Sequence, residues 1–140
     1  MLSLEEAHAA IKRGVAKAQE LGFKVALAVV DDAGHLVACD RMDGALWVTP
    51  EIARAKANAA AAFQATTADL ESRFATARAL FAGNVASLGD YKLVFGRGGV
   101  PLVDGDRVVG AVGVSGAVPP DNDHVIADAA AGHPVVPKSH

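Results

Sequence analysis

Hydrophobic residues follow a helical period over residues 4–21 and then change to a strand-like pattern. Ser3 and Glu6 have the spacing of a capping box at the start of this helix. Residues 25–30 form a continuous apolar run that predicts a buried strand. Residues 35–41 are predicted to return as its partner, so the chain begins with a helix and a β-hairpin.

Two helices are predicted in the middle of the chain. Thr49 and Pro50 are residue types preferred at a helix N-cap and at the first helical position. The helix that starts there carries alanine on every face, which indicates that it is enclosed on more than one side. Thr66 and Thr67 are expected to break it, and a second helix is predicted over residues 68–81.

The last third of the chain predicts a meander and a final helix. Three segments separated by glycine-containing turns are predicted strands: residues 91–96, 100–103 and 107–115. A helix is predicted over residues 123–131, and the tail 133–140 is expected to be extended or docked on a partner. The order α-β-β-α-α-β-β-β-α predicts one α+β domain over residues 1–140, with helices against an antiparallel sheet.

Composition narrows the function classes. Apolar residues make up 51% of the chain and charged residues 21%, which indicates a packed core. The net charge of -3 and the lack of a Lys/Arg cluster argue against nucleic acid as a partner. A single cysteine, no signal-peptide pattern and no membrane-spanning apolar run predict a cytoplasmic protein without a membrane partner.

The last predicted strand has one face that is nearly free of side chains. Alternation places Ala111, Gly113 and Ser115 on that face, so another group must approach the backbone closely. Packing of the alanine-rich helix is the favoured interpretation, and a flat ligand lying on the sheet is the alternative.

Polar residues gather at the start of the final helix. Asp121 and Asn122 suit the role of caps, which leaves Asp123 to accept a hydrogen bond or to move a proton. His124 has Asp128 one turn later, which orients it or pairs with it.

Four further side chains are candidates for ligand contacts. Lys56 lies among alanines and either extends to water or, if enclosed, acts as a base or binds an anion. Arg41 and Asp43 flank a turn and favour an ordinary ion pair, and His35 beside its turn is expected to be exposed.

His8 lies at the edge of the first apolar stripe, between Leu4 and Ile11. A histidine there is either a satisfied core residue or an axial ligand of haem iron. No pair of histidines has a His-x-x-x-His spacing, so a zinc site is poorly supported. Gly98 and Gly99 are followed by neither lysine nor helix, which excludes a P-loop.

Four motifs in the same order resemble a known family: VVDDAGHLVACDRMDGA, a Lys-Ala pair in the alanine-rich helix, GGVPL, and VVGAVGVSG before an Asp-bearing helix. Together they resemble the GlcG/HbpS-like haem-binding family, also called haem-degrading, which includes the C-terminal domains of PduO-type proteins. The resemblance implies a profilin-like, five-stranded antiparallel sheet flanked by helices. It also implies haem as a cofactor and homo-oligomers from dimers up to octamers.

The family pattern falls on His35, Arg41, Met42, Asp43, Gly44, Lys56, Gly98, Gly99, Pro101, Gly110, Gly113, Ser115, Gly116 and Asp123. Among these, the predicted ligand-binding residues are His35, Arg41, Asp43, Gly98, Gly99, Ser115, Gly116 and Asp123. The sequence departs from the pattern at Asn122, where relatives have Gln, and in its proline-containing tail.

Three functional hypotheses remain open at this point. The first is a small-molecule binding protein that holds haem or another planar metabolite near the end of the last strand, at a subunit interface. The second is a cofactor-independent lyase, isomerase or hydrolase of small-metabolite catabolism that uses Asp123 and His124 with Arg41 and Lys56. The third is an accessory subunit without a ligand.

Overall fold

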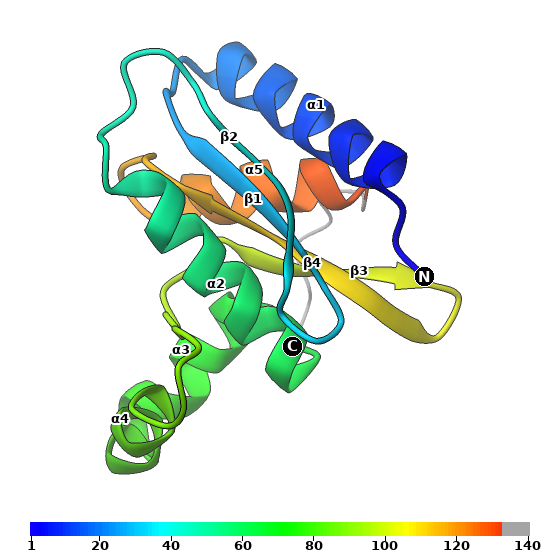
Figure 1. Ribbon diagram of the computed structural model, residues 1–140. Helices are drawn as coiled ribbons and strands as arrows, with labels where there is room; N and C mark the ends of the chain where they lie inside the picture. Colours follow the sequence, from blue (N-terminus) through cyan, green and yellow to red (C-terminus); the bar gives the residue numbers. More distant parts are fainter. Residues whose placement is uncertain (133–140) are drawn as a thin grey trace.

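A four-stranded antiparallel sheet separates two layers of helices in the computed structural model, which describes residues 1–132 (Figure 1). The elements are α1 (Leu4–Leu21), β1 (Ala26–Asp31), β2 (Leu36–Arg41), α2 (Thr49–Phe63), α3 (Thr67–Thr76), α4 (Ala79–Ala86), β3 (Gly99–Asp104), β4 (Arg107–Ser115) and α5 (Asp121–Ala131). The strand order is β2-β1-β4-β3, with every neighbouring pair antiparallel. The α+β class is therefore confirmed.

Helix α1 begins and ends at the residues that the sequence predicts, because both ends are capped. The Ser3 hydroxyl accepts a hydrogen bond from the Glu6 amide at 3.0 Å, and the Ser3 amide donates to the Glu6 carboxylate at 3.0 Å. Gly22 ends the helix in the left-handed conformation at a φ of 83°. Because each end satisfies its own backbone groups, the prediction from local sequence is correct here.

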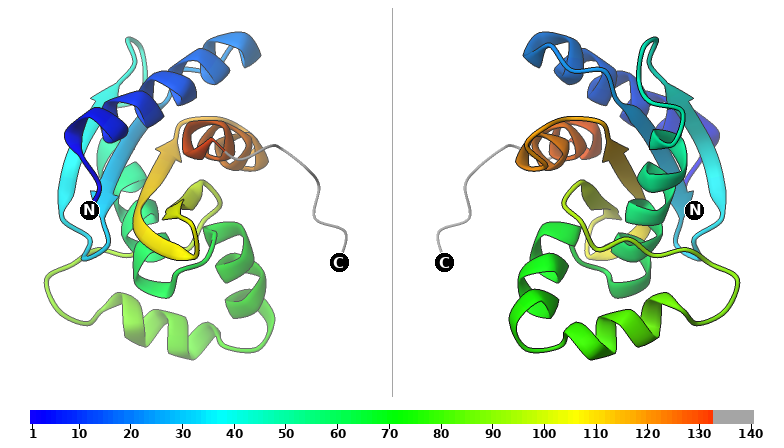
Figure 2. Two further views of the ribbon diagram at one scale, coloured as in Figure 1. Left: turned by 90° about the vertical axis from the view of Figure 1, so that its right-hand side faces the viewer. Right: turned by 90° about the vertical axis from the view of Figure 1, so that its left-hand side faces the viewer.

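The two faces of the sheet carry side chains of different size. Branched residues face α1 and α5, which lie side by side on one face (Figure 2). The opposite face presents small residues to α2, among them Ala26, Ala28 and Ala111. This difference in size lets α2 lie much closer to the strands than α1 and α5 do.

Gly113 marks the closest approach of α2 to the sheet. A Cβ built on Gly113 would collide with the carbonyl oxygen of Ala53 and lie 2.8 Å from the amide nitrogen of Ala57. The predicted packing of the alanine-rich helix on the bare face of β4 is confirmed. The alternative, a flat ligand on this face, is wrong because α2 occupies the space.

The predicted strand over residues 91–96 is absent from the sheet, which has four strands rather than five. The amide of Val94 donates to the carbonyl of Ala55 in α2 at 3.2 Å, so this segment pairs with a helix. The Phe95 ring packs edge-on against Phe63 and Phe74, at centroid distances of 5.8 and 5.0 Å. Aromatic packing on the helices explains why an alternating apolar pattern did not produce a strand here.

The predicted helix over residues 68–81 is two helices, so the order is α-β-β-α-α-α-β-β-α. Ala77 and Arg78 leave the helical conformation between α3 and α4. The guanidinium of Arg78 lies 4.0 Å from the centroid of the Phe81 ring, and this ring lies 5.9 Å from that of Phe74. The break lets Phe81 fold back onto α3, and the helix then continues through Gly83.

Two helix starts differ slightly from the sequence prediction. Thr49 lies inside the first turn of α2 rather than at its N-cap, and its hydroxyl donates to the carbonyl of Leu46 at 2.7 Å. α5 begins at Asp121, two residues before the predicted start at Asp123.

Within residues 1–132 no helix is both long and apolar enough to cross a bilayer. The expectations for the tail 133–140 lie outside the described residues.

We expect Gly113→Ala to lower the free energy of unfolding by about 1–3 kcal/mol or more, because the added methyl group forces α2 away from β4. Gly83→Ala is the matched control, since a Cβ there meets no atom within 4 Å and alanine favours a helix. Urea unfolding measures both. Equal stability of the two variants would contradict the close packing described here.

Candidate functional site

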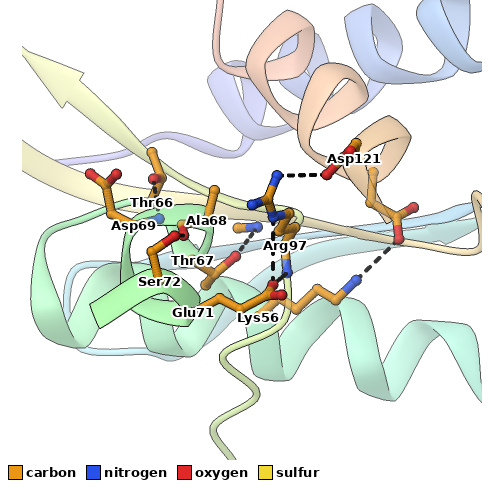
Figure 3. A network of polar contacts seen from close by, with 11 residues as sticks. Lys56, Thr66, Thr67, Ala68, Asp69, Glu71, Ser72, Arg97 and Asp121 are labelled. Atoms are coloured by element: carbon orange, nitrogen blue, oxygen red, sulfur yellow. Dashed lines mark hydrogen bonds and ion pairs between the residues drawn. The ribbon is translucent and has the colours of Figure 1, made fainter. Parts of the chain in front are cut away.

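A buried ion pair between Lys56 of α2 and Asp123 of α5 links helices that cover opposite faces of the sheet. Lys56 is labelled in Figure 3, and a dashed line leads from its ammonium to an unlabelled side chain of the facing helix. The Lys56 ammonium lies 3.2 Å from the Asp123 Oδ2 and donates to the carbonyl of Val114 at 3.0 Å. The two side chains are only 7% and 5% exposed. Of the two interpretations of Lys56, extension to water is wrong and enclosure is observed, with a partner for its charge that sequence reasoning did not assign to it.

The Asp123 carboxylate also holds the turn that follows β4. Its Oδ1 accepts a hydrogen bond from the amide of Ala117 at 2.9 Å. Burial raises the pKa of the Asp123 carboxyl above its ordinary value, and the Lys56 ammonium and the amides of Ala117 and Gly116 counteract this rise. Gly116 adopts a φ of 130° in this turn, and a Cβ there would lie 2.7 Å from the carbonyl oxygen of Lys24.

The backbone at Gly98 and Gly99 packs directly against the Lys56–Asp123 ion pair and the end of β4. A Cβ on Gly98 would lie 2.5 Å from the Val114 carbonyl oxygen and 3.1 Å from the Lys56 ammonium. The Gly99 amide donates to the hydroxyl of Thr67 at 2.8 Å, a partner that the sequence pattern did not reveal. These glycines therefore bring β3 against the ion pair and fill the space around it.

Arg97 connects α3 to α5 just outside this cluster (Figure 3). Its guanidinium donates to the Asp121 carboxylate at 2.6 Å and lies 3.7 Å from that of Glu71. The prediction that Asp121 and Asn122 cap α5 is wrong, because the N-cap is Pro120 and no side chain caps the helix. Asp121 instead accepts a hydrogen bond from Arg97. Nothing in the local sequence predicts this contact, because the two residues are far apart along the chain.

His124 lies on α5 next to the ion pair in sequence. Its Nε2 is 3.8 Å from the Asp128 carboxylate, as the spacing predicted. Its Nδ1 is buried and has no hydrogen-bond partner among residues 1–132.

Arg41 and Asp43 lie at a separate cavity of about 720 Å³, beside the C-terminal end of α1. No ion pair between them is present in the described part of the chain, so the predicted pairing is not observed. Lys24, Phe23 and Met42 also line this space, which we call the α1 cavity. Its walls combine apolar side chains with charged groups of both signs.

His35 lines a second cavity of about 990 Å³, between α2 and the β1–β2 hairpin, which we call the α2 cavity. Its Nδ1 lies 3.5 Å from the Asp31 carboxylate, and its side chain is exposed as predicted.

His8 is exposed on α1, and the expectation that it is partly buried is wrong for this chain. The buried stripe of α1 runs through Ala7 and Ile11, so His8 faces outward with the exposed Leu4 one turn before it. No hydrogen bond to its imidazole occurs within residues 1–132. At 1.5 Å per residue, His8 lies about 10 Å along α1 from Val15 at the near end of the α1 cavity and about 21 Å from Gly22 at its far end.

The structure thus divides the predicted site residues other than His124 among four places. One cluster gathers Lys56, Gly98, Gly99, Ser115, Gly116 and Asp123 at the end of β4. The others are the α1 cavity, the α2 cavity and the outer face of α1. Within residues 1–132 no group of three or more His, Cys, Asp or Glu residues is arranged to hold a metal ion.

Known proteins resemble this chain over most of its length. The family described as haem degrading protein HbpS-like matches residues 2–132. Protein GlcG of Escherichia coli K12 is 37% identical over 117 residues, which cover 82% of this chain and 81% of GlcG.

Solved structures agree with this match. A double mutant of Streptomyces reticuli HbpS has a TM-score of 0.83 and 32% identity, covering 94% of this chain and 85% of that one. A complex of PduOC with haem has a TM-score of 0.82 and 28% identity, covering 94% and 93%.

We expect Lys56→Met to lower the free energy of unfolding by about 3–5 kcal/mol at neutral pH, because it leaves the Asp123 carboxylate buried without its counter-ion. Loss of the ammonium also raises the pKa of Asp123 further above its unfolded value. A raised folded pKa contributes stability below the unfolded pKa, and this contribution is lost as pH rises through the folded pKa. The defect should therefore diminish in acid.

Urea unfolding from neutral to acidic pH measures this effect. Adding Asp123→Asn to Lys56→Met should recover part of the stability, since no buried charge remains. Lys17→Met is the control, because its pair with Glu20 is at the surface and contributes below about 1 kcal/mol. A Lys56→Met variant as stable as the wild type across the pH range would contradict the assigned pairing.

Proposed function

The chain belongs to the HbpS-like family, and on that premise we propose that it binds haem between two copies of the chain, with His8 as an axial ligand to the iron. Haem binding is known in this family from the complex of PduOC with haem. The α1 cavity of one copy would hold the ring, and His8 would come from the other copy. The observation that carries this proposal is an exposed imidazole on the same helix that lines a cavity of suitable size.

The α1 cavity fits an amphipathic planar anion. Its volume of about 720 Å³ lies within the range typical of small-molecule sites. Phe23 and Met42 are half-buried and offer apolar surface. Lys24 and Arg41 can pair with the two carboxylates of haem, while Asp40 and Asp43 in the same wall oppose a nearby anion.

The outer face of α1 fits the role of a ligand donor. A neutral imidazole coordinates haem iron, and both nitrogens of His8 are unengaged within the described residues. Leu4 is 55% exposed one turn away and would pack on the ring or on the neighbouring copy. Bound haem would supply the redox chemistry of its iron, while these side chains bind it, orient it and exclude water.

The distance along α1 supports a site shared between copies. His8 lies about 10 Å along α1 from Val15, the lining residue of the α1 cavity nearest to it on this helix, and about 21 Å from Gly22, so a ring seated toward Gly22 and Lys24 would take its axial imidazole from another copy. The cavity also adjoins the end of β4, because Gly116 packs on the backbone of Lys24. A subunit interface at that end of the last strand brings the two halves together.

The enzymatic alternative receives less support. Lys56 and Asp123 are bonded to each other inside closely packed backbone, where a substrate has no room. Arg41 lies on β2, two strands from Ser115, which places its Cα roughly 10 Å from the end of β4. His124 would have to act without those partners.

Titration with hemin tests the axial ligand. We expect a Soret band for the wild type, and for His8→Ala an altered band and an affinity weaker by at least about tenfold, because a metal ligand is lost. His35→Ala, which removes another exposed histidine, should behave as wild type. A wild-type spectrum and affinity for His8→Ala would refute the assignment.

Mixing two variants tests the shared site. Arg41→Glu should weaken binding by removing a cation from the α1 cavity. When His8→Ala and Arg41→Glu chains are refolded together, each mixed pair keeps one intact site, so roughly a quarter of the sites should recover. A mixture that binds no more hemin than the separate variants would place the whole site within one chain.

A further inference from the structure

We propose that the α2 cavity is a second ligand site, which takes a small organic ammonium ion with an apolar body. Its volume of about 990 Å³ lies at the upper end of the range typical of small-molecule sites. Its polar centre is Asn58, whose side-chain oxygen has no hydrogen-bond partner within residues 1–132. None of its lining residues is shared with the α1 cavity.

Three segments build the walls of this cavity. They are the turn of the β1–β2 hairpin (residues 32–35), one face of α2 and the stretch 90–94. Val48 at the N-cap of α2 and positions 51, 55, 58 and 62 recur at the spacing of one helix face, with Ile52 and Arg54 beside that row. Ala55 and Ala62 are small, which leaves room between the helix and the other two segments.

The stretch 90–94 forms a roof because its backbone is attached to α2 at two points. The Val94 amide donates to the carbonyl of Ala55 at 3.2 Å, and the Asn58 side-chain amide donates to the carbonyl of Lys92 at 3.1 Å. This segment would have closed the space if it had joined the sheet as a strand. Instead it lies across α2 and covers the cavity from one side.

The Asn58 side chain is oriented for accepting a hydrogen bond. It is 7% exposed, and its nitrogen is already committed to Lys92, so its oxygen is fixed on the opposite side. That oxygen lies 3.5 Å from the place a Cβ on Gly34 would occupy, so it faces the hairpin turn. A buried acceptor without a donor is unfavourable, and a ligand N–H would satisfy it.

The charges around the cavity favour a cation. Asp32, Glu51 and Asp90 line it, against Arg54 and Lys92. With carboxylates in the majority, a cationic donor is attracted and an anion is repelled. His35 also lines the cavity, and its imidazole lies close to the carboxylate of Asp31, which is not a lining residue.

Apolar groups complete the recognition. Ile52 and Val94 line the cavity and are half-buried, so they offer surface to a hydrocarbon body. Tyr91 is 50% exposed and belongs to the same wall. Its ring can bind an ammonium group over its face.

NMR titration with three probes of one shape tests this proposal. Benzylamine is a cationic donor, benzyl alcohol a neutral donor and benzoate an anion. We expect benzylamine to shift the Asn58 side-chain amide and the backbone amides of residues 90–94 in a saturable way. Benzyl alcohol should bind more weakly, and benzoate should produce no shift. Shifts as large with benzoate as with benzylamine would overturn the proposal.

Two variants complete the test. Asn58→Leu should weaken benzylamine binding at least about tenfold, because it removes the acceptor. If that variant does not fold, Ile52→Trp decides the question, since it fills the cavity and leaves Asn58 intact. Lys17→Met changes a surface residue outside this cavity and should bind benzylamine as the wild type does. An unchanged benzylamine titration with Ile52→Trp would refute the site, whatever the outcome of the hemin experiments.

Discussion

The contact between α2 and the backbone of β4 at Gly113 is the constraint on which the rest of the structure depends. Only a glycine admits the Ala53 carbonyl at that point, and the alanines along α2 extend the contact over the sheet. At this distance the Lys56 side chain reaches the end of β4 and pairs with Asp123 on the other layer. The close packing of the alanine-rich α2 on β4 therefore places the charged Lys56 side chain where Asp123 and the Val114 carbonyl can bind it.

Close packing around Lys56 contrasts with two cavities elsewhere in the molecule. Around Lys56 the backbones of Gly98, Gly99 and Gly116 fill the available space, so these glycines build structure there rather than a ligand site. Cavities remain where larger elements diverge, beside the end of α1 and under the stretch 90–94. The side-chain oxygen of Asn58, which accepts no hydrogen bond within residues 1–132, belongs to the wall of the second cavity. Residues of the hairpin motif line both cavities, with Arg41 and Asp43 at one and His35 at the other.

Local signals predicted much of the fold. The capping box at Ser3, the left-handed Gly22 and the hairpin turn act over a few residues, and each element they bound was found. Predictions failed where distant contacts outweighed local pattern. Phe95 packs on aromatic rings of α2 and α3, so its segment is not a strand, and Asp121 pairs with Arg97 rather than capping α5.

The sequence by itself determined the ends of α1, the β1–β2 hairpin, the bare face of β4 and the family to which the chain belongs. These properties depend on residues near one another along the chain or on motifs that can be read in order. Only the tertiary structure decided that Lys56 faces Asp123, that His8 is exposed and that Asn58 opens into a cavity. Partners of this kind are far apart in sequence, and burial and pairing are set by which surfaces the fold brings together.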